Sequence, residues 1–364
     1  MSKPFSLLFC GPVPEPGAAP AGGYEASNSR TIAALAAAGR PVQVLRYPQP
    51  RGGAISKLKG YWRGFGILLA ELGRQPAGGV LHVTGLYKQF VIPELLLLRR
   101  ARRRGLVTVY DVRAGSMLKH YARLGPLYRW LFRTTLRSAD LVMIEGQEYA
   151  PFIERHTGRA PFYLPNHVGL AEVPAPARSA SGPPRLVYVG RVTVEKGIET
   201  ALQAAQLLAA QGLRFEIAVA GPGDAALMER LRRDYAHLPV EWLGSLQANE
   251  VLAQFGRAHF FVFPTRHGGE GHSNALTEAM AMGCVPVAAE NGFNRSVIAD
   301  TGRVLPLQAD ATAYAAVLRE LWTSGQWSGL SVLAAQRARE HFATEQVVAR
   351  LLAAYAGLSE RKKA

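Results

Sequence analysis

The feature that most limits the fold of this chain is a repeated alternation of short apolar runs with longer helical segments. In the second half the apolar runs occupy residues 186–189, 215–220, 240–242, 259–263 and 285–288. Helical segments lie between them, at residues 199–210, 225–235, 249–257 and 274–282. Buried strands that alternate with helices form parallel sheets covered on both faces. The second half is therefore predicted to be a Rossmann-like α/β domain.

The first half shows the same pattern less regularly. Its apolar runs lie at residues 6–10, 41–46, 80–84, 107–110 and 141–144, with a helix expected at about 25–38. Residues 171–185 are rich in Pro, Ala, Ser and Gly and lack any periodicity, which is typical of a linker. We therefore predict a first Rossmann-like domain at 1–170, a linker at 171–185 and a second domain at 186–343.

Positive charge is concentrated in the first half of the chain. The 364 residues contain 42 Lys and Arg against 27 Asp and Glu, a net charge of +15. Residues 1–170 hold 23 of the basic and 9 of the acidic residues, whereas residues 171–364 hold 19 and 18. A half that is basic while the other is balanced indicates an anionic partner for that half.

Cysteine content and hydropathy indicate the cellular compartment of the protein. Cys10 and Cys284 are its two cysteines, too few for a disulfide framework or a multi-cysteine zinc site. The sequence has no apolar stretch of about 20 residues and no signal-peptide cleavage pattern at its start. We expect a cytoplasmic protein.

Residues 263–288 form the stretch with the most chemical information, FPTRHGGEGHSNALTEAMAMGCVPVA. A strand runs into a glycine-rich loop with Glu270 and then into a helix with Glu278. Backbone N–H groups at the start of that helix favour an anion. A carboxylate can accept hydrogen bonds from neighbouring sugar hydroxyls. Alternatively, Ser273 or Asn274 only caps the helix.

A second stretch, GRVTVEKG at residues 190–197, follows the first strand of the second half. Arg191 and Lys196 place two cations on one loop, which would face the same crevice as Glu270. Such a pair can neutralise a diphosphate leaving group without a metal. The alternative is that both are solvated surface cations.

Together these stretches resemble the C-terminal domain of the family 4 glycosyltransferases, nucleotide-sugar-dependent enzymes with the GT-B fold. The resemblance rests on Gly190-Arg191 with Lys196-Gly197, and on Glu270, which seven residues separate from Glu278 at the start of the run EAMAMGCVPV. It covers residues 185–305 strongly and the first half mainly in architecture. It implies two Rossmann-like domains that face each other across a cleft, with the C-terminal helix, 344–364, packed on the first domain.

The resemblance also implies roles for individual residues. Arg191 and Lys196 would bind the donor diphosphate, Glu278 the nucleotide ribose, and Glu270 the hydroxyls of the transferred sugar. Further donor contacts would come from Gly22, Gly23, Gly221, Gly271, His272, Ser273, Asn274 and Ala275. Gly221 begins a loop expected near the nucleotide base; as an NAD fingerprint this loop lacks the third glycine.

Enzymes of this family retain the anomeric configuration and need no metal, and we expect both here. Glu270, Lys196 and Arg191 would then act by positioning and charge stabilisation. Where many relatives have a His after the fourth strand, this chain has Asp111-Val112-Arg113. Asp111 is a candidate catalytic residue that would orient the acceptor or sugar, or alternatively a residue that only caps the following segment.

Basic and aromatic residues of the first half favour an anionic membrane surface. Five arginines (99, 100, 102, 103 and 104) follow four leucines, and Lys57, Lys59 and Arg63 accompany Tyr61, Trp62 and Phe65. Solvated helix faces are the alternative. Nucleic acid would also suit this charge, but no helix-turn-helix, zinc-finger, RRM or KH pattern is present.

The sequence thus predicts a retaining glycosyltransferase, peripheral on the inner face of the plasma membrane. Its donor would be a UDP- or GDP-sugar and its acceptor a glycan or a lipid-linked sugar, as in O-antigen (lipopolysaccharide), capsule or exopolysaccharide synthesis. The alternatives are a nucleotide-sugar epimerase, an inactive GT-B scaffold and a basic nucleic-acid-binding protein.

Overall fold

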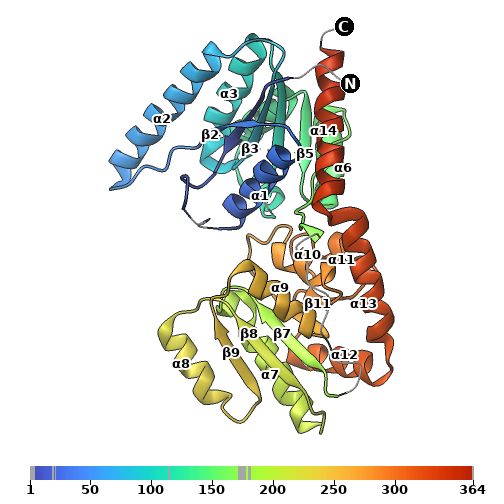
Figure 1. Ribbon diagram of the computed structural model, residues 1–364. Helices are drawn as coiled ribbons and strands as arrows, with labels where there is room; N and C mark the ends of the chain where they lie inside the picture. The colour runs from blue at the N-terminus through green and yellow to red at the C-terminus, as the bar shows by residue number, and fades with distance from the viewer. Residues whose placement is uncertain are drawn as a thin grey trace. The chain divides into compact units, whose positions relative to one another are not determined.

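A computed structural model of the chain divides it into two compact units (Figure 1). It describes residues 5–18, 20, 22–113, 115–170, 178 and 182–362. Unit 1 comprises residues 1–165 and 345–364, and unit 2 comprises residues 166–344. Most of the expected linker, residues 171–177 and 179–181, lies outside the described residues.

Unit 1 is built on a six-stranded parallel sheet. The strands in spatial order are β2 (Val42–Arg46), β1 (Leu7–Gly11), β3 (Val80–Gly85), β4 (Val107–Val112), β5 (Leu141–Ile144) and β6 (Phe162–Tyr163). The helices are α1 (Gly23–Ala37), α2 (Ala54–Arg74), α3 (Val91–Arg103), α4 (Met117–Arg123), α5 (Pro126–Ser138) and α6 (Ala150–Thr157). Strands β1, β3 and β4 are buried throughout, as central strands of a covered parallel sheet must be.

The last helix, α14 (Thr344–Arg361), also belongs to unit 1, beside whose sheet Figure 1 shows it in red. Val347, Leu351 and Tyr355 recur at helical spacing and pack in one core cluster with strand residues of β1, β3 and β4. Unit 1 is therefore built from both ends of the chain.

Unit 2 repeats the architecture with a second six-stranded parallel sheet. Its strands in order are β12 (Arg303–Leu305), β11 (Val285–Ala289), β10 (Phe260–Phe263), β7 (Arg185–Val189), β8 (Glu216–Ala220) and β9 (Val240–Gly244). Its helices are α7 (Ile198–Ala210), α8 (Ala225–Asp234), α9 (Ala248–Arg257), α10 (Asn274–Ala281), α11 (Asn294–Ile298), α12 (Ala311–Thr323) and α13 (Gln326–Arg337).

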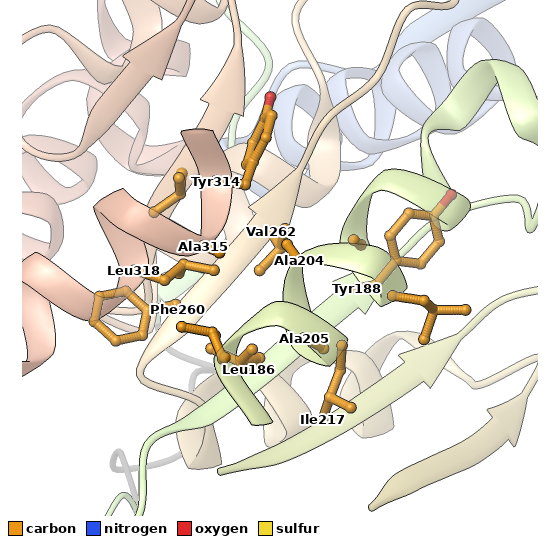
Figure 2. Close-up of a cluster of buried hydrophobic side chains, with 14 of the residues drawn as sticks. Leu186, Tyr188, Ala204, Ala205, Ile217, Phe260, Val262, Tyr314, Ala315 and Leu318 are labelled. Carbon is orange, nitrogen blue, oxygen red and sulfur yellow. The ribbon is translucent and has the colours of Figure 1, made fainter. Parts of the chain in front are cut away.

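The core of unit 2 lies between the sheet and the helices α7 and α12 (Figure 2). Strand residues such as Leu186, Ile217 and Phe260 meet Ala204 and Ala205 of α7, whose small side chains let the helix approach the sheet closely. This packing holds the carboxyl ends of β7, β8 and β10 in place, and the loops that follow those strands begin there.

A buried carboxyl group, Glu94 of α3, lies inside unit 1. Its Oε2 accepts a hydrogen bond from Tyr110 (2.6 Å), and its Oε1 accepts one from the Leu86 amide (2.6 Å) and one from Tyr47 (3.3 Å). Burial raises the pKa of Glu94 to about 7, although these hydrogen bonds oppose the rise. The protonated form of Glu94 therefore contributes to the stability of the fold.

We predict that the free energy of unfolding falls by about 3 kcal/mol as the pH rises from about 5 to about 8, because a group whose pKa is raised on folding loses its contribution above that pKa. Glu94→Gln should remove most of this pH dependence in urea unfolding. Glu71→Gln, at a less buried position on α2, is the matched control. An unchanged pH dependence in Glu94→Gln would contradict the assignment.

Candidate functional site

The polar residues singled out from the sequence gather at one edge of the unit 2 sheet. Because β7 pairs in parallel with both β8 and β10, the loops that follow these three strands start side by side. They are residues 190–197 after β7, 221–224 after β8 and 264–273 after β10. Residues of these three loops can therefore come into contact at this edge although they are far apart in the sequence.

Lys196 and Glu270 form an ion pair at this edge. Lys196 Nζ lies 2.6 Å from Glu270 Oε2, although the two residues are 74 positions apart. Glu270 is buried and Lys196 is partly buried. The short turn Val194–Lys196 supports the lysine, because the Thr193 hydroxyl accepts a hydrogen bond from the Lys196 amide (3.3 Å). The two predicted residues thus lie in one site.

Thr265 and Phe263 complete the surroundings of this ion pair. The Thr265 hydroxyl donates to the same Glu270 oxygen at 2.7 Å, and its residue is fully buried. Lys196 Nζ lies 6.0 Å from the centre of the Phe263 ring, within the range of a cation–π contact. Glu270 is therefore oriented from its own loop as well as by the lysine.

Tyr188, which the sequence reasoning missed, supports both cations. It is the fourth residue of β7, is buried, and is labelled in Figure 2. Its hydroxyl donates to the carbonyl of Arg191 at 2.8 Å and lies 3.4 Å from that of Lys196. Burial, followed by the charge of Glu270, raises the pKa of Tyr188, which keeps the hydroxyl a donor. The Arg191 residue itself is exposed.

Two glycines allow the loops to approach so closely. Gly197 has φ +80°, and a Cβ there would collide with the carbonyl of Pro264 in the neighbouring loop. Gly221 has φ +136°, and a Cβ there would collide with the carbonyl of Gly190. Any side chain at these positions would force the three loops apart.

The loop with Glu270 leads into the amino terminus of α10. Ser273 is the N-cap residue, but its side chain makes no capping hydrogen bond. Asn274 and Ala275 are the first two residues of this helix, and the amides of a helix's first turn point out of its amino terminus. Glu278 follows one turn later and is half-buried, as are Gly271, Ser273 and Asn274. The predicted donor-binding backbone therefore surrounds a helix terminus that favours anions.

The His272 side chain is held by the protein itself. Its ring Nδ1 accepts from the Asn166 amide (3.3 Å), and its Nε2 lies 2.7 Å from the Thr277 hydroxyl. An amide can only donate, so Nδ1 is the acceptor and Nε2 bears the hydrogen. The ring thus fixes the loop. The contact with the nucleotide-sugar donor that the sequence predicts for His272 would therefore have to come from its backbone.

A second support comes from the turn after β11, which sequence reasoning also missed. Asn291 Nδ2 donates to the carbonyls of Thr265 (3.1 Å) and His267 (2.9 Å). Gly292 has φ +56°, and a Cβ there would collide with the Glu270 carbonyl. The Asn-Gly pair directly after an apolar run was a usable turn signal. Its function as a clamp on the Glu270 loop was not visible in the sequence.

A depression of about 220 Å³ lies at the ends of β7, β8 and β9, with Arg191 in its lining. Its walls are mostly apolar and include Gly190, Gly221, Pro222, Leu246 and Val251. The Val192 amide donates to the Pro222 carbonyl at 2.7 Å and ties the two loops together. Its shape and lining suit a flat heterocycle next to a charged group.

The remaining predicted residues belong to unit 1. Gly22 and Gly23 lie at the start of α1, in backbone conformations open to other residues and with space for a Cβ. The fold of unit 1 therefore does not itself require glycine there.

Asp111 lies at the end of β4 and is completely buried. Its Oδ2 accepts from Arg113 (2.5 Å) and lies 3.3 Å from His82 Nε2, whose other ring nitrogen lies 2.6 Å from the Tyr355 hydroxyl of α14. Burial alone would raise the pKa of Asp111, but Arg113 and His82 outweigh it and hold the pKa below its usual range. Asp111 is thus ionised inside a network that connects β3, β4 and α14.

Comparisons with known proteins agree with this geometry. The family described as "Glycosyl transferases group 1" matches residues 183–324, the region that contains Arg191, Lys196, Glu270 and Glu278. Among the described residues, no three His, Cys, Asp or Glu side chains gather in a way that would hold a metal ion.

Curated relatives are glycosyltransferases of polysaccharide synthesis. The chain is 28% identical over 216 residues to the putative colanic acid biosynthesis glycosyltransferase WcaL of Escherichia coli, covering 56% of this chain and 51% of WcaL. It is 30% identical over 164 residues to the amylovoran biosynthesis glycosyltransferase AmsK of Erwinia amylovora, covering 43% and 40%. The chain therefore spans about half the length of the curated relatives it matches.

The solved sucrose-phosphate synthase of Thermosynechococcus elongatus has the same fold. Its TM-score is 0.75 at 18% identity, over 97% of this chain and 99% of that one. The predicted fold class, α/β with two Rossmann-like domains of the GT-B type, is confirmed. Residues 183–324 are thus similar to the group 1 glycosyltransferases, and the chain as a whole has the GT-B fold.

Proposed function

We propose that this protein transfers a sugar from a nucleotide diphosphate donor to a glycan or a lipid-linked acceptor. The observation that carries the proposal is the Lys196–Glu270 ion pair at 2.6 Å, beside the amino terminus of α10. WcaL and AmsK are named for the biosynthesis of colanic acid and amylovoran, which favours a role in surface polysaccharide synthesis, such as O-antigen, capsule or exopolysaccharide.

Lys196 and Arg191 would neutralise the diphosphate as it leaves. The Lys196 ammonium now pairs with Glu270, so a bound diphosphate would take over that cation while Thr265 keeps its hydrogen bond to the carboxylate. Charge that develops on the leaving oxygen would then meet two cations already in place. Such preorganised charges stabilise a transition state without reorganisation.

Glu270 and Glu278 would bind the hydroxyl groups of the donor. Glu270, released from Lys196, would accept hydrogen bonds from the transferred sugar, and Glu278 would accept them from the ribose. The amides of α10 would contact phosphate and sugar. The depression near Gly221 would hold the base of a UDP- or GDP-sugar.

We further propose that transfer retains the anomeric configuration and needs no metal. The acceptor hydroxyl would attack the anomeric carbon from the face that the diphosphate leaves. Its oxygen would form the new glycosidic bond, the bond from carbon to phosphate oxygen would break, and the departing phosphate would take the proton. The protein would contribute positioning and charge stabilisation.

Unit 1 would contribute the acceptor side and one further contact to the donor. Gly22 and Gly23 leave room for the donor diphosphate to approach the backbone, which gives these glycines a use that the fold alone does not. Asp111, as part of its buried network, would orient the acceptor or the sugar through Arg113. An acceptor at the cytoplasmic face of the plasma membrane fits the basic charge of residues 1–170.

A nucleotide-sugar epimerase and an inactive GT-B scaffold are the remaining alternatives. Either would bind the nucleotide in the same place, so binding alone does not separate them from a transferase. The presence of both cations and both glutamates in one site favours transfer over a scaffold. A nucleic-acid-binding role has no support in the unit 2 site.

The first prediction concerns the donor. In a thermal shift panel of nucleotide diphosphates, their sugar conjugates and NAD, one nucleotide family should stabilise the protein, by about 2.7 kcal/mol at 100 times Kd. Glu278→Ala should abolish the shift because it removes the ribose acceptor. An NAD shift, or no shift with any nucleotide in a folded sample, contradicts the donor site.

The second prediction concerns the leaving group. Lys196→Ala should lower transfer about 100- to 1000-fold, because one preorganised charge is lost. Arg214→Ala, an exposed arginine of unit 2 outside the site, is the control and should leave transfer unchanged. Product analysis with the matching donor measures both. Normal turnover in Lys196→Ala would exclude the assigned role.

The third prediction concerns Thr265 as a positioning residue. Thr265→Val keeps the shape but removes the 2.7 Å hydrogen bond to Glu270, and should lower kcat about 10- to 100-fold. Binding of the nucleotide diphosphate without sugar should stay unchanged, and Thr265→Ser should restore transfer. Equal losses in Thr265→Val and Thr265→Ser would indicate a packing role only.

A further inference from the structure

Three helices of unit 1, α2, α3 and α5, carry most of the exposed apolar surface. Helix α2 packs on α3, and α3 packs on α5; Figure 1 shows α2 and α3 side by side. In the described part of the chain, twelve large hydrophobic side chains are exposed. Eight of them lie on these helices: Ile55, Leu58, Trp62, Ile67, Ile92, Leu96, Leu127 and Trp130. A surface with so many exposed apolar side chains is typical of an interaction site.

The apolar face of helix α2 is buried in its second half and exposed in its first half. Phe65, Leu68 and Leu72 are buried and pack on the unit. Ile55, Leu58 and Trp62 continue this face toward the amino terminus as a stripe at spacings of three and four residues, and they are 73%, 59% and 58% exposed. No described part of the chain covers this stripe.

The structure corrects the sequence-based view of the aromatic residues here. Phe65 is buried, and the Tyr61 ring packs edge-on against Phe90 with centroids 5.4 Å apart. Both therefore support the attachment of α2 to the unit. Trp62 alone of the three points to solvent, where an aromatic side chain can reach a membrane interface.

The charged side chains of these three helices are almost all basic. Helices α2, α3 and α5 contain eleven Lys and Arg against two acidic residues, Glu71 and Glu94. Glu94 is buried, and Glu71 accepts a hydrogen bond from Gln43 (2.8 Å). Seven of the cationic side chains make no hydrogen bond or ion pair with the described residues: Lys57, Lys59, Arg63, Arg74, Arg99, Arg100 and Arg103.

We infer that the first half of α2 inserts its exposed Ile55–Leu58–Trp62 stripe into an anionic lipid bilayer, with the flanking cations on the headgroups. An amphipathic helix with a basic polar face and a Trp on its apolar face has this preference. A second copy of the chain fits less well, because a symmetric contact would bring like charges together. This inference rests on the proposed function and identifies the surface that would contact the membrane.

This contact is interfacial. Within the described residues, no helix is both long and apolar enough to cross a bilayer. Binding would therefore be reversible and would depend both on the apolar stripe and on ionic strength.

The test uses the full chain and vesicles, without donor or acceptor. Wild-type protein should sediment with phosphatidylglycerol–phosphatidylcholine vesicles at low salt and be released at high salt, with little binding to phosphatidylcholine alone. An Ile55→Ser, Leu58→Ser, Trp62→Ser variant should bind at least about tenfold more weakly at low salt. A Lys57→Gln, Lys59→Gln, Arg63→Gln variant should lose a similar factor.

The matched control is Val332→Ser with Leu333→Ser, two exposed apolar side chains on α13 of unit 2, which should leave binding unchanged. All positions are exposed, so unchanged thermal unfolding should confirm that each variant folds. Wild-type protein that ignores anionic vesicles overturns the inference. So does an Ile55, Leu58, Trp62 variant that binds like wild type.

Sedimentation equilibrium without lipid covers the second-copy alternative. A wild-type dimer that the apolar variant turns into a monomer, with unchanged vesicle binding, would assign the stripe to self-association and overturn the inference. The vesicle experiment contains no donor or acceptor, so its result does not depend on nucleotide binding or sugar transfer. Failure of the catalytic proposal can therefore be distinguished from failure of the membrane proposal.

Discussion

The parallel pairing of β7 with both β8 and β10 determines which loops of unit 2 can meet. Parallel strands present all their carboxyl ends at one edge, so the loops after residues 220 and 263 start on either side of the loop after residue 189, each one strand spacing of about 4.8 Å away from it. Gly197 and Gly221 then let the loops approach backbone to backbone. The proposed donor site is built from the loops at this edge of the sheet.

The ion pair between Lys196 and Glu270 is a consequence of placing both charges in a partly buried site. An unpaired charge there would cost more free energy than a paired one, so the two side chains neutralise each other. A ligand that separates the two must supply a negative group for the lysine and hydrogen-bond donors for the carboxylate. The proposed donor, a diphosphate joined to a sugar, would supply both within one molecule.

Most strands could be predicted from the sequence because they follow from the periodicity of apolar residues. The contact between Lys196 and Glu270 could be predicted because each residue lies in a loop that follows one of two neighbouring strands. Strands β6 and β12 escaped prediction because they are only two and three residues long. Tyr188, Thr265 and Asn291 escaped it for another reason. Each acts through one or two hydrogen bonds at the ends of β7, β10 and β11, and no sequence pattern indicates such a bond.

The network around Asp111 shows why composition alone cannot assign the basic charge of unit 1. Arg113 is buried and neutralised by Asp111, so it adds nothing to the field outside. The cations of α2, by contrast, are exposed beside an apolar stripe and lack acidic neighbours. Like charges on one surface repel each other, and this repulsion destabilises the unit unless a partner compensates it. An anionic surface would relieve that repulsion and cover the stripe at the same contact.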